Sequence, residues 1–343
     1  MRILVTGSAG FIGFHLAEKL ARMNHRVTGM DNINNYYDTA LKLARLEHSG
    51  IDTEHIEDEK PLQSRTLPSY TFIKIDLCSK PAIFSLFEKK NFDCVINLAA
   101  QAGVRYSIEN PEAYIASNIT GFFNILEAVR HFKTGHLVFA SSSSVYGLNE
   151  KIPFSVSDKT DSPVSLYAAT KKSNELLAFS YSHLYSIPMT GLRFFTVYGP
   201  WGRPDMAPFI FTKAIIEGKP IKVFNNGSMK RDFTYIDDVV EGIVRIASII
   251  PEASPAPFGL FNIGYGQPVD LLSCIETIET CTGKKAEKQF LPMQAGDVPV
   301  TWAETSDFEK ASGYKPKTGI DKGIPQFVNW YTGKYLPLTK VTK

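Results

Sequence analysis

The sequence predicts an α/β fold in which a doubly wound parallel sheet is joined to a second, smaller α/β domain. Strand-like and helix-like segments alternate up to about residue 195. Several of the strand-like runs are apolar on both faces, which is typical of parallel strands covered by helices on each side. Beyond residue 195 the alternation gives way to turn-rich stretches, which indicates a change of architecture.

The first part of the chain is expected to supply six strands. The strand-like runs lie at residues 2–6, 26–30, 70–76, 93–99, 136–141 and 189–195. Helical patterns lie near residues 11–22, 80–89, 112–131 and 163–184. In the last of these segments, Ser162 is expected to cap the helix and Pro163 to occupy its first turn.

The length of 343 residues favours two domains. We assign residues 1–195 to the first domain. Residues 196–343 are assigned to a smaller substrate-binding domain, interleaved with returns of the chain to the first. A polar segment at residues 47–69 has no clear period, and we interpret it as a surface loop inserted into the first domain.

Composition and charge argue against several classes of function. The formal net charge is +2 and no basic run carries interleaved aromatic residues, so nucleic acid is not an expected partner. No run reaches the roughly 18 apolar residues of a membrane span. Glycine and charge interrupt the amino-terminal apolar run too early for a signal peptide, so we expect a cytoplasmic protein. The four cysteines lack metal-ligand spacing, and no metal is expected.

A glycine-rich loop lies directly after the first expected strand and at the start of a helix. In "ILVTGSAGFIG", Gly7 permits a tight turn, Gly10 lets the backbone approach a pyrophosphate, and Gly13 allows close packing of helix on sheet. The amino end of a helix attracts such an anion. A glycine triplet alone also fits an ordinary turn, but its place between strand and helix indicates a Rossmann dinucleotide site, with Phe11 and Ile12 beside the ligand.

An acidic residue follows at the position that selects between the two nicotinamide dinucleotides. Asp31 comes 18 residues after Gly13, at the end of the second expected strand. Its carboxylate can accept hydrogen bonds from the adenosine ribose hydroxyls and would repel a ribose phosphate. Asn32 follows it, rather than an arginine or lysine. The sequence therefore predicts NAD as the cofactor.

Two further strand ends are expected to border the cofactor, since ligands of such folds lie beside the carboxyl ends of the strands. The third strand ends in an Asp that could reach the adenine amino group, and the fourth ends in small residues over which the cofactor could cross. Simple packing would also explain the small residues. The residues assigned to these strand ends are Asp76, Leu77, Leu98, Ala99, Ala100 and Gln101.

A tyrosine and a lysine four residues apart form the candidate acid/base pair. Tyr167 and Lys171 lie in a segment with helical period, which places them on one face about 6 Å apart. The phenol titrates near 10, so it needs a neighbouring cation to act as a base at neutral pH. Tyr70 and Lys74 have the same spacing, but their alternating segment reads as a strand and would hold them about 13 Å apart.

Serine hydroxyls precede this pair at a strand end. "HLVFASSSSVYG" places Ser141, Ser142, Ser143 and Ser144 after the fifth expected strand, about 25 residues before the tyrosine. A polar loop or a helix cap would also account for a serine run. A hydroxyl at a strand end, followed by a helix with Tyr and Lys, is however a suitable acid/base site.

The motifs "GSAGFIG", "SSSSVYG" and "YAATK" together resemble the extended short-chain dehydrogenase/reductase superfamily over nearly the whole chain. Within it, "RFFTVYGPWGRPDMAPF" and "RDFTYIDDVV" resemble the nucleotide-sugar 4-epimerase branch, in particular the UDP-glucuronate 4-epimerases. Acidic residues that related dehydratases and decarboxylases need are serines here. The resemblance implies an isomerase that uses NAD on a UDP-hexuronic acid, and a homodimer formed through the helices near 112–131 and 163–184.

The resemblance also implies roles for individual residues. Tyr167 would be the base, Lys171 would hold the nicotinamide ribose, and Ser142 and Ser144 would contact substrate and relay the proton, with Ser143 beside them. The residues implied to bind the nucleotide or the sugar carboxylate are Arg231, Asp297, Thr196, Arg203 and Arg105. One departure is Ala295, where the family usually has Pro.

Three other functions remain open on the sequence. A UDP-glucose/UDP-galactose 4-epimerase would share every catalytic residue and differ only in the sugar pocket, where it places an Asn at the position of Thr196. A plain NAD-dependent reductase would leave the motifs after residue 195 unexplained. A non-catalytic NAD-binding regulator would be expected to have a broken Tyr-Lys-Ser set, which is intact here.

Overall fold

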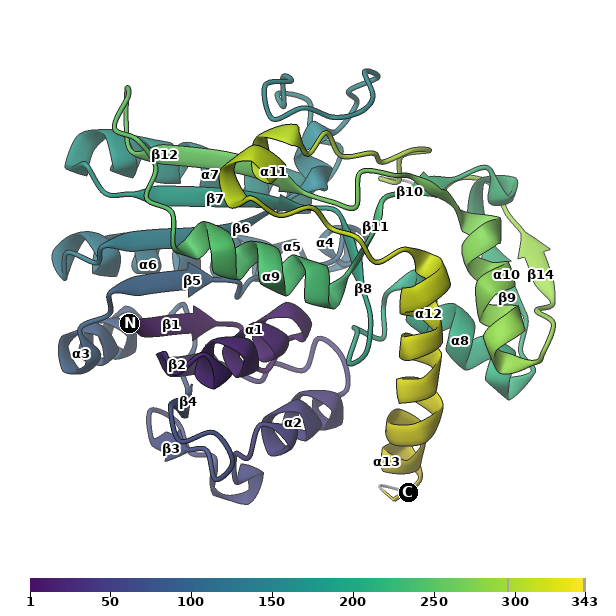
Figure 1. Cartoon of the computed structure of the whole chain (residues 1–343), viewed down its shortest axis with the longest axis horizontal. Coiled ribbons are helices and arrows are strands. Elements are labelled where there is room, and N and C mark those ends of the chain that lie inside the picture. Colours follow the sequence, from purple (N-terminus) through teal and green to yellow (C-terminus); the bar gives the residue numbers. More distant parts are fainter. Residues whose placement is uncertain (295, 342–343) are drawn as a thin grey trace.

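The computed structural model describes residues 1–294 and 296–341, so Ala295 lies outside the described residues. An eight-stranded sheet forms the centre of the molecule (Figure 1). All its strands run parallel except the last, which is antiparallel to its neighbour. Their order across the sheet is β12 (Phe258–Ile263), β7 (Met189–Phe194), β6 (His136–Ser142), β5 (Cys94–Asn97), β1 (Arg2–Thr6), β2 (Arg26–Asp31), β4 (Tyr70–Lys74) and β3 (Pro61–Gln63).

Helices cover both faces of this sheet and form two hydrophobic cores. One face carries α1 (Phe11–Arg22) and α9 (Ile236–Ala247), with α2 (Thr39–His48) and α11 (Ser306–Ser312) nearby. The other face carries α3 (Lys80–Lys90), α6 (Phe122–His131) and α7 (Leu166–Tyr185). Burial on both faces explains why the strands read as continuous apolar runs. The doubly wound α/β fold is confirmed.

A smaller group of elements lies beyond the carboxyl ends of the strands (Figure 1). Its helices are α8 (Ala207–Glu217), α10 (Leu271–Thr282), α12 (Ile320–Trp330) and α13 (Leu336–Val341). Its short strands pair as β8 (Thr196–Tyr198) with β11 (Phe233–Tyr235), β9 (Ile221–Val223) with β14 (Lys288–Phe290), and β10 (Lys230–Arg231) with β13 (Val269–Asp270). The chain returns to the large sheet with β12, which pairs in parallel with β7.

The six strands predicted from the sequence are all present, and no end differs from the prediction by more than two residues. The helix predicted near residues 112–131 is interrupted. It begins with α5 (Pro111–Tyr114), continues as a π-helical segment at Ile115–Gly121, and ends with α6. A short helix, α4 (Tyr106–Glu109), precedes it. The extra residue in a π turn has no signal in hydrophobic periodicity.

The predicted start of the long helix is wrong by three residues. Helix α7 begins at Leu166, and its cap is Ser165, whose side chain accepts a hydrogen bond from the Ala168 N–H at 3.1 Å. The backbone oxygen of Ser162 accepts instead from the Leu148 N–H at 3.4 Å. Because Ser162 is bound to this neighbouring loop, the helix starts at the next serine.

The polar segment at residues 47–69 is more than a loop. It contains a 3-10 turn at Thr53–His55 and the edge strand β3, whose register places Leu62 opposite Phe72 of β4. Short edge strands of this kind lack a buried face and therefore lack the alternating pattern of an interior strand. Among the described residues, no helix is long and apolar enough to cross a membrane.

Candidate active site

A large cavity of about 1090 Å³ lies at the carboxyl ends of the parallel strands. It runs from the glycine loop, past the ends of β2, β4, β5 and β6, to the smaller group of elements around α8 and β9. Every residue that the sequence analysis assigned to cofactor, catalysis or substrate lines this cavity. The strands meet at one sheet edge, so side chains that are far apart in sequence converge there.

The glycine loop forms one end of the cavity and leaves no room for side chains. Gly7 has a φ of +73°, and a Cβ on it would lie 2.9 Å from the backbone nitrogen of Ala99. A Cβ on Gly13 would lie only 2.1 Å from the Gly7 oxygen. Gly10 is the N-cap of α1 and offers no side chain to the helix end, so the first amides of α1 remain open toward a ligand.

Carboxylates lie at the ends of β2 and β4, as predicted. Asp31 is 8% exposed and accepts hydrogen bonds from the Ala9 N–H at 3.1 Å and the Ile33 N–H at 2.8 Å. Asn32 donates to Asp76 at 2.7 Å. Burial alone would raise the pKa of Asp76, but hydrogen bonds from Asn32 and Cys78 hold it below its usual value. The Asp76 carboxylate is therefore available as an acceptor at neutral pH.

Tyr167 and Lys171 lie on the same face of α7, one turn apart, and both line the cavity. The Lys171 ammonium donates to the backbone oxygen of Ala140 in β6 at 2.9 Å, which fixes its position behind the strand end. Burial lowers the pKa of Lys171 from 10.5 to about 8. Burial raises the pKa of Tyr167, and contacts with Ser142 and the charge of Arg203 offset this only in part.

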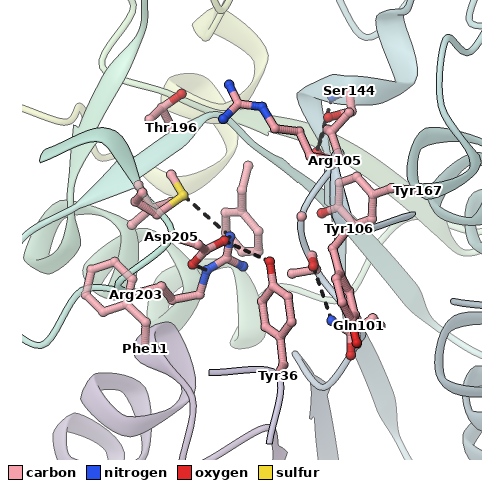
Figure 2. A pocket seen from close by; sticks show the side chains of 18 of the residues that line it. Phe11, Tyr36, Gln101, Arg105, Tyr106, Ser144, Tyr167, Thr196, Arg203 and Asp205 are labelled. Atoms are coloured by element: carbon pink, nitrogen blue, oxygen red, sulfur yellow. Dashed lines mark hydrogen bonds and ion pairs between the residues drawn. The ribbon is translucent and has the colours of Figure 1, made fainter. Parts of the chain in front are cut away.

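The serine run continues β6 into a 3-10 turn, and Figure 2 shows Ser144 of this turn near Tyr167. Ser142 Oγ caps this turn by accepting from the Ser144 N–H at 3.2 Å. Its hydroxyl also lies 3.2 Å from Ser144 Oγ. These two linked hydroxyls lie at the carboxyl end of β6, where Ser142 contacts the phenol of Tyr167. Ser143 lines the same cavity.

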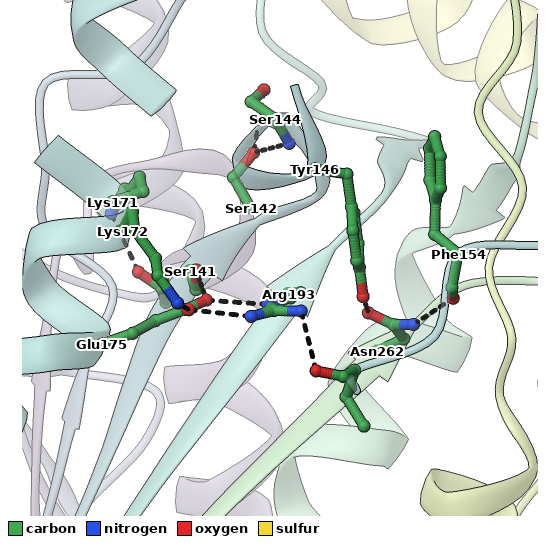
Figure 3. A network of polar contacts seen from close by, with 12 residues as sticks. Ser141, Ser142, Ser144, Tyr146, Phe154, Lys171, Lys172, Glu175, Arg193 and Asn262 are labelled. Atoms are coloured by element: carbon green, nitrogen blue, oxygen red, sulfur yellow. Dashed lines mark hydrogen bonds and ion pairs between the residues drawn. The ribbon is translucent and has the colours of Figure 1, made fainter. Parts of the chain in front are cut away.

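A buried polar network lies directly behind this serine turn (Figure 3). Arg193 of β7 and Glu175 of α7 form a bidentate pair with distances of 2.8 and 2.9 Å, and their side chains are 1% and 3% exposed. Ser141 donates to the same carboxylate at 2.6 Å. The Arg193 guanidinium lies 4.8 Å from the ring of Tyr146. The network therefore connects α7, β6 and β7 beneath the catalytic candidates.

Arginines line the opposite end of the cavity, and each already has partners there. Arg105 pairs with Asp297 at 3.2 Å and lies over the ring of Phe224 at 5.2 Å. Arg231 donates from Nη1 to the backbone oxygens of Lys230 and Pro299, at 2.9 and 3.1 Å. Burial lowers the pKa of Arg231, although the charge of Asp297 opposes this effect.

Thr196 and Arg203 line the part of the cavity between these two ends. Thr196 is half-buried at the start of β8, where its N–H donates to the Asp232 oxygen at 3.1 Å. Arg203 follows in the loop that leads to α8, and its partner is Asp205 at 3.0 Å. Arg203 thus contributes a guanidinium to the cavity, but one that is already paired.

Sequence reasoning missed several polar side chains that line the cavity, among them Tyr36, Lys42 and Asp205. Lys42 of α2 donates to Asn34 at 2.7 Å and lies 3.9 Å from the carboxylate of Asp31. Its helix was not among the predicted elements. For Asp205 a signal existed, since it lies two residues after the arginine of "GPWGRPD". Tyr36 has no local signal, because its partner is 169 residues away.

The glycine loop, the Tyr-Lys pair and the shared cavity define a class of protein. A family model described as the NAD dependent epimerase/dehydratase family matches residues 3–264. The chain belongs to this family, which confirms the resemblance inferred from its motifs.

Several relatives of the chain carry the name UDP-glucuronate 4-epimerase. The chain is 45% identical to a probable UDP-glucuronate 4-epimerase of Rhizobium meliloti, over 98% of each chain. It is also 45% identical to UDP-glucuronate 4-epimerase 4 of Arabidopsis thaliana, covering 97% of this chain and 76% of the relative. A crystal structure of UDP-glucuronic acid 4-epimerase from Bacillus cereus, in complex with UDP-glucuronic acid and NAD, is similar with a TM-score of 0.85 and 33% identity, over 97% of this chain and 99% of that one.

Proposed function

We propose that the protein is a UDP-glucuronate 4-epimerase, which reversibly inverts carbon 4 of UDP-glucuronate to give UDP-galacturonate. One observation carries the proposal: Tyr167, Lys171 and the linked serine hydroxyls lie in the same cavity as a glycine loop built for a dinucleotide. Relatives with this name at 43–45% identity over 97–98% of the chain support it.

The residues at the glycine end fit NAD. The backbone there is bare of side chains where a pyrophosphate would lie, and the open amides of α1 would bind the anion. Asp31 would accept from ribose hydroxyls, and the end of β4 would meet the adenine. When bound there, NAD would accept a hydride from carbon 4 of the sugar and return it.

The chain's own groups would carry the proton and hold the substrate. Tyr167 takes the proton of the 4-hydroxyl as the 4-keto sugar forms. Ser142 and Ser144 are hydrogen-bonded to the oxygen on carbon 4. Lys171 binds the nicotinamide ribose and stabilises the phenolate by its charge. Arg231 holds the pyrophosphate of the UDP moiety, for which a guanidinium is well suited. The keto ring then rotates about its link to the pyrophosphate and presents its other face, so carbon 4 is inverted without net redox change.

Reaction rate is expected to fall as the pH rises through about 8. Because burial lowers the pKa of Lys171 to about 8, the ammonium loses its proton above that pH rather than above 10.5. The phenolate then loses its neighbouring cation. We expect the initial rate of epimerisation, followed between roughly pH 6 and 10, to show this fall. In Lys171→Arg the guanidinium stays charged, so the alkaline fall should be absent at a lower overall rate. An unaltered alkaline fall in that variant would remove Lys171 as its cause.

The pocket must also prevent loss of the sugar carboxylate. The 4-keto uronic acid is a β-keto acid, which loses carbon dioxide when its carboxylate-bearing bond aligns with the ketone π system. Short hydroxyls at Ser144 and Thr196 leave room for the carboxylate and can donate to it. Arg203 supplies a charge in the same part of the cavity. The paired geometry of Arg105 with Asp297 suits the nucleotide end better.

Thr196→Asn is expected to shift the enzyme toward neutral UDP-sugars. The longer amide fills the space that the threonine leaves for a carboxylate. The activity ratio of UDP-glucose to UDP-glucuronate should rise about tenfold or more, because a hydrogen bond to a charged group contributes roughly 1.5 kcal/mol or more. Thr196→Ser, which keeps the short hydroxyl, is the matched control and should keep the ratio. An unchanged ratio in Thr196→Asn would refute the assignment.

We further propose the organisation that the sequence suggested. Residues 1–195 together with β12 form the NAD-binding domain, and the remaining part of residues 196–343 binds the UDP-sugar.

Apolar side chains support a homodimer through α7 and its neighbours, because Leu176, Phe179 and Phe123 are 60%, 41% and 39% exposed, whereas Leu166 and Leu177 are half-buried. We also propose that the enzyme acts in the cytoplasm.

The direct test of function uses the purified protein with no added NAD. It is incubated separately with UDP-glucuronate and with UDP-glucose, and the proton couplings at carbon 4 are followed by NMR. Conversion of the uronate alone to its galacto isomer supports both the epimerase and the carboxylate preference. Conversion of UDP-glucose alone would assign the chain to the UDP-glucose/UDP-galactose 4-epimerases and contradict the roles of Thr196 and Arg203. No conversion of either sugar would contradict the proposed function.

A further inference from the structure

The guanidinium of Arg203 is anchored on one side by a carboxylate of its own loop. Its Nε lies 3.1 Å from Oδ1 of Asp205, and its Nη2 lies 3.0 Å from Oδ2. This bidentate geometry fixes the plane of the guanidinium as well as its distance. Nη2 also lies 3.4 Å from the sulfur of Met206. Nη1 donates no hydrogen bond to a side chain or backbone oxygen in the part of the chain that the structure describes. It is therefore the donor left for a ligand.

Asp205 is itself held from the other side of the cavity (Figure 2). The hydroxyl of Tyr36 donates to Asp205 Oδ2 at 3.0 Å. Tyr36 lies in the loop between β2 and α2, five residues after Asp31 of the cofactor end. Burial and the nearby Asp205 charge raise the pKa of Tyr36 far above its ordinary value, so its hydroxyl remains a donor at any physiological pH. The loop of the first domain is thus tied to the loop that carries Arg203.

The ring of Tyr36 is packed in a row of tyrosines that ends at the base. Its centroid lies 4.8 Å from that of Tyr106, which lies 6.3 Å from Tyr114, which lies 6.1 Å from Tyr167. A Cβ on Gly103 would come within 2.4 Å of the Tyr36 hydroxyl, so the ring has no space to shift toward that backbone. Tyr36 therefore holds Asp205 at a fixed distance from the reacting end of the cavity.

We propose that Asp205 and Tyr36 are positioning residues for Arg203 and thereby determine the preference for a sugar that carries a carboxylate. The inference rests on the proposed function. Asp205 occupies the Nε–Nη2 side of the guanidinium, and Nη1 is directed to the sugar carboxylate. Without its anchor the long arginine side chain would sample several rotamers and meet the carboxylate in several geometries. A neutral sugar makes no ionic contact with Arg203, so it is insensitive to the anchor.

The anchor has a chemical consequence beyond affinity. If the carboxylate of the 4-keto sugar is held loosely, the bond from carbon 5 to carbon 6 can align with the ketone π system. That bond then breaks, its electron pair passes through carbon 4 onto the ketone oxygen, carbon dioxide leaves, and carbon 5 takes up a proton. The step needs no added oxidant, because the ketone already exists. A loosened Arg203 should therefore increase the carbon dioxide released per epimerisation.

The test compares Asp205→Asn and Tyr36→Phe with the unaltered enzyme. For Asp205→Asn we expect kcat/KM for UDP-glucuronate to fall about 10- to 100-fold, mainly through KM, the range for loss of a hydrogen bond to a charged group. Tyr36→Phe should act in the same direction by about 3- to 10-fold, because it removes one neutral donor. Binding of UDP-glucose, as substrate or as competitive inhibitor, should be unchanged in both. The carbon dioxide released per epimerisation should rise in both variants, and more in Asp205→Asn than in Tyr36→Phe.

Asp93→Asn is the matched control. Asp93 pairs with Arg2 at 2.6 Å through the same kind of contact, but at the amino end of the sheet and outside the cavity. The Asp93→Asn variant should keep the kcat/KM for UDP-glucuronate and the binding of UDP-glucose unchanged. If Asp205→Asn weakens UDP-glucose as much as UDP-glucuronate, or changes neither, the inference is overturned. Should Asp205→Asn fail to fold, Tyr36→Phe decides by the same criteria. Failure of the unaltered enzyme to convert UDP-glucuronate would instead contradict the proposed function.

Discussion

Replacing Tyr167 by Phe is expected to lower turnover of UDP-glucuronate about 100- to 10,000-fold, the contribution of a positioned acid/base residue. The substitution removes the only atom of the side chain that can take the proton of the 4-hydroxyl and leaves the ring in place. Because the ring packs edge-on against Tyr114 at 6.1 Å, the fold around it should be preserved. The measurement is kcat under saturating substrate, with the content of bound NAD determined alongside.

The matched control removes a hydroxyl from another tyrosine of the same helix. Tyr181 donates to Glu127 at 2.8 Å and lies outside the cavity. Tyr181→Phe should retain nearly full turnover. If Tyr167→Phe keeps more than about a tenth of the activity, Tyr167 is not the base.

Replacing Glu175 by Gln is expected to lower the free energy of unfolding by about 3–5 kcal/mol. The reason is that Arg193, 1% exposed, would retain its charge in the interior without the opposite charge. Arg193 cannot neutralise itself by losing a proton. Denaturation by urea, followed by circular dichroism, measures the change.

Two further substitutions test whether the loss of stability comes from an unpaired charge in the interior. Glu127→Gln removes the partner of Arg130, whose side chain is 40% exposed, and should cost less than about 1 kcal/mol. The double substitution Glu175→Leu with Arg193→Met should recover much of the stability, because apolar residues of similar volume can replace a buried pair. A cost below about 1 kcal/mol for Glu175→Gln would contradict the assignment of a rigid support beneath the serine turn.

Much of the fold and the membership of the cavity could be predicted, because both follow from strong local patterns. Buried parallel strands must be apolar on both faces, and their carboxyl ends must share one edge. The glycine loop was recognisable because it lies between a strand and a helix. The cap of α7 was not, because Ser162 and Ser165 are equally suitable locally and a contact with Leu148 decides between them.

The links across the cavity could not be predicted. The hydrogen bond from Tyr36 to Asp205 joins residues 169 positions apart and has no periodic or compositional trace. The pair of Glu175 and Arg193 likewise depends on how α7 packs on β7. Sequence motifs identify which chemical groups are present, whereas these contacts decide how the groups are oriented.

The central claim is that a hydride leaves carbon 4 and returns to the opposite face of the same sugar. It is tested most directly with UDP-glucuronate that carries deuterium at carbon 4, incubated with the purified enzyme in ordinary water. The account predicts UDP-galacturonate in which the deuterium remains at carbon 4, formed without added NAD. Loss of the deuterium to the solvent during epimerisation would contradict the account.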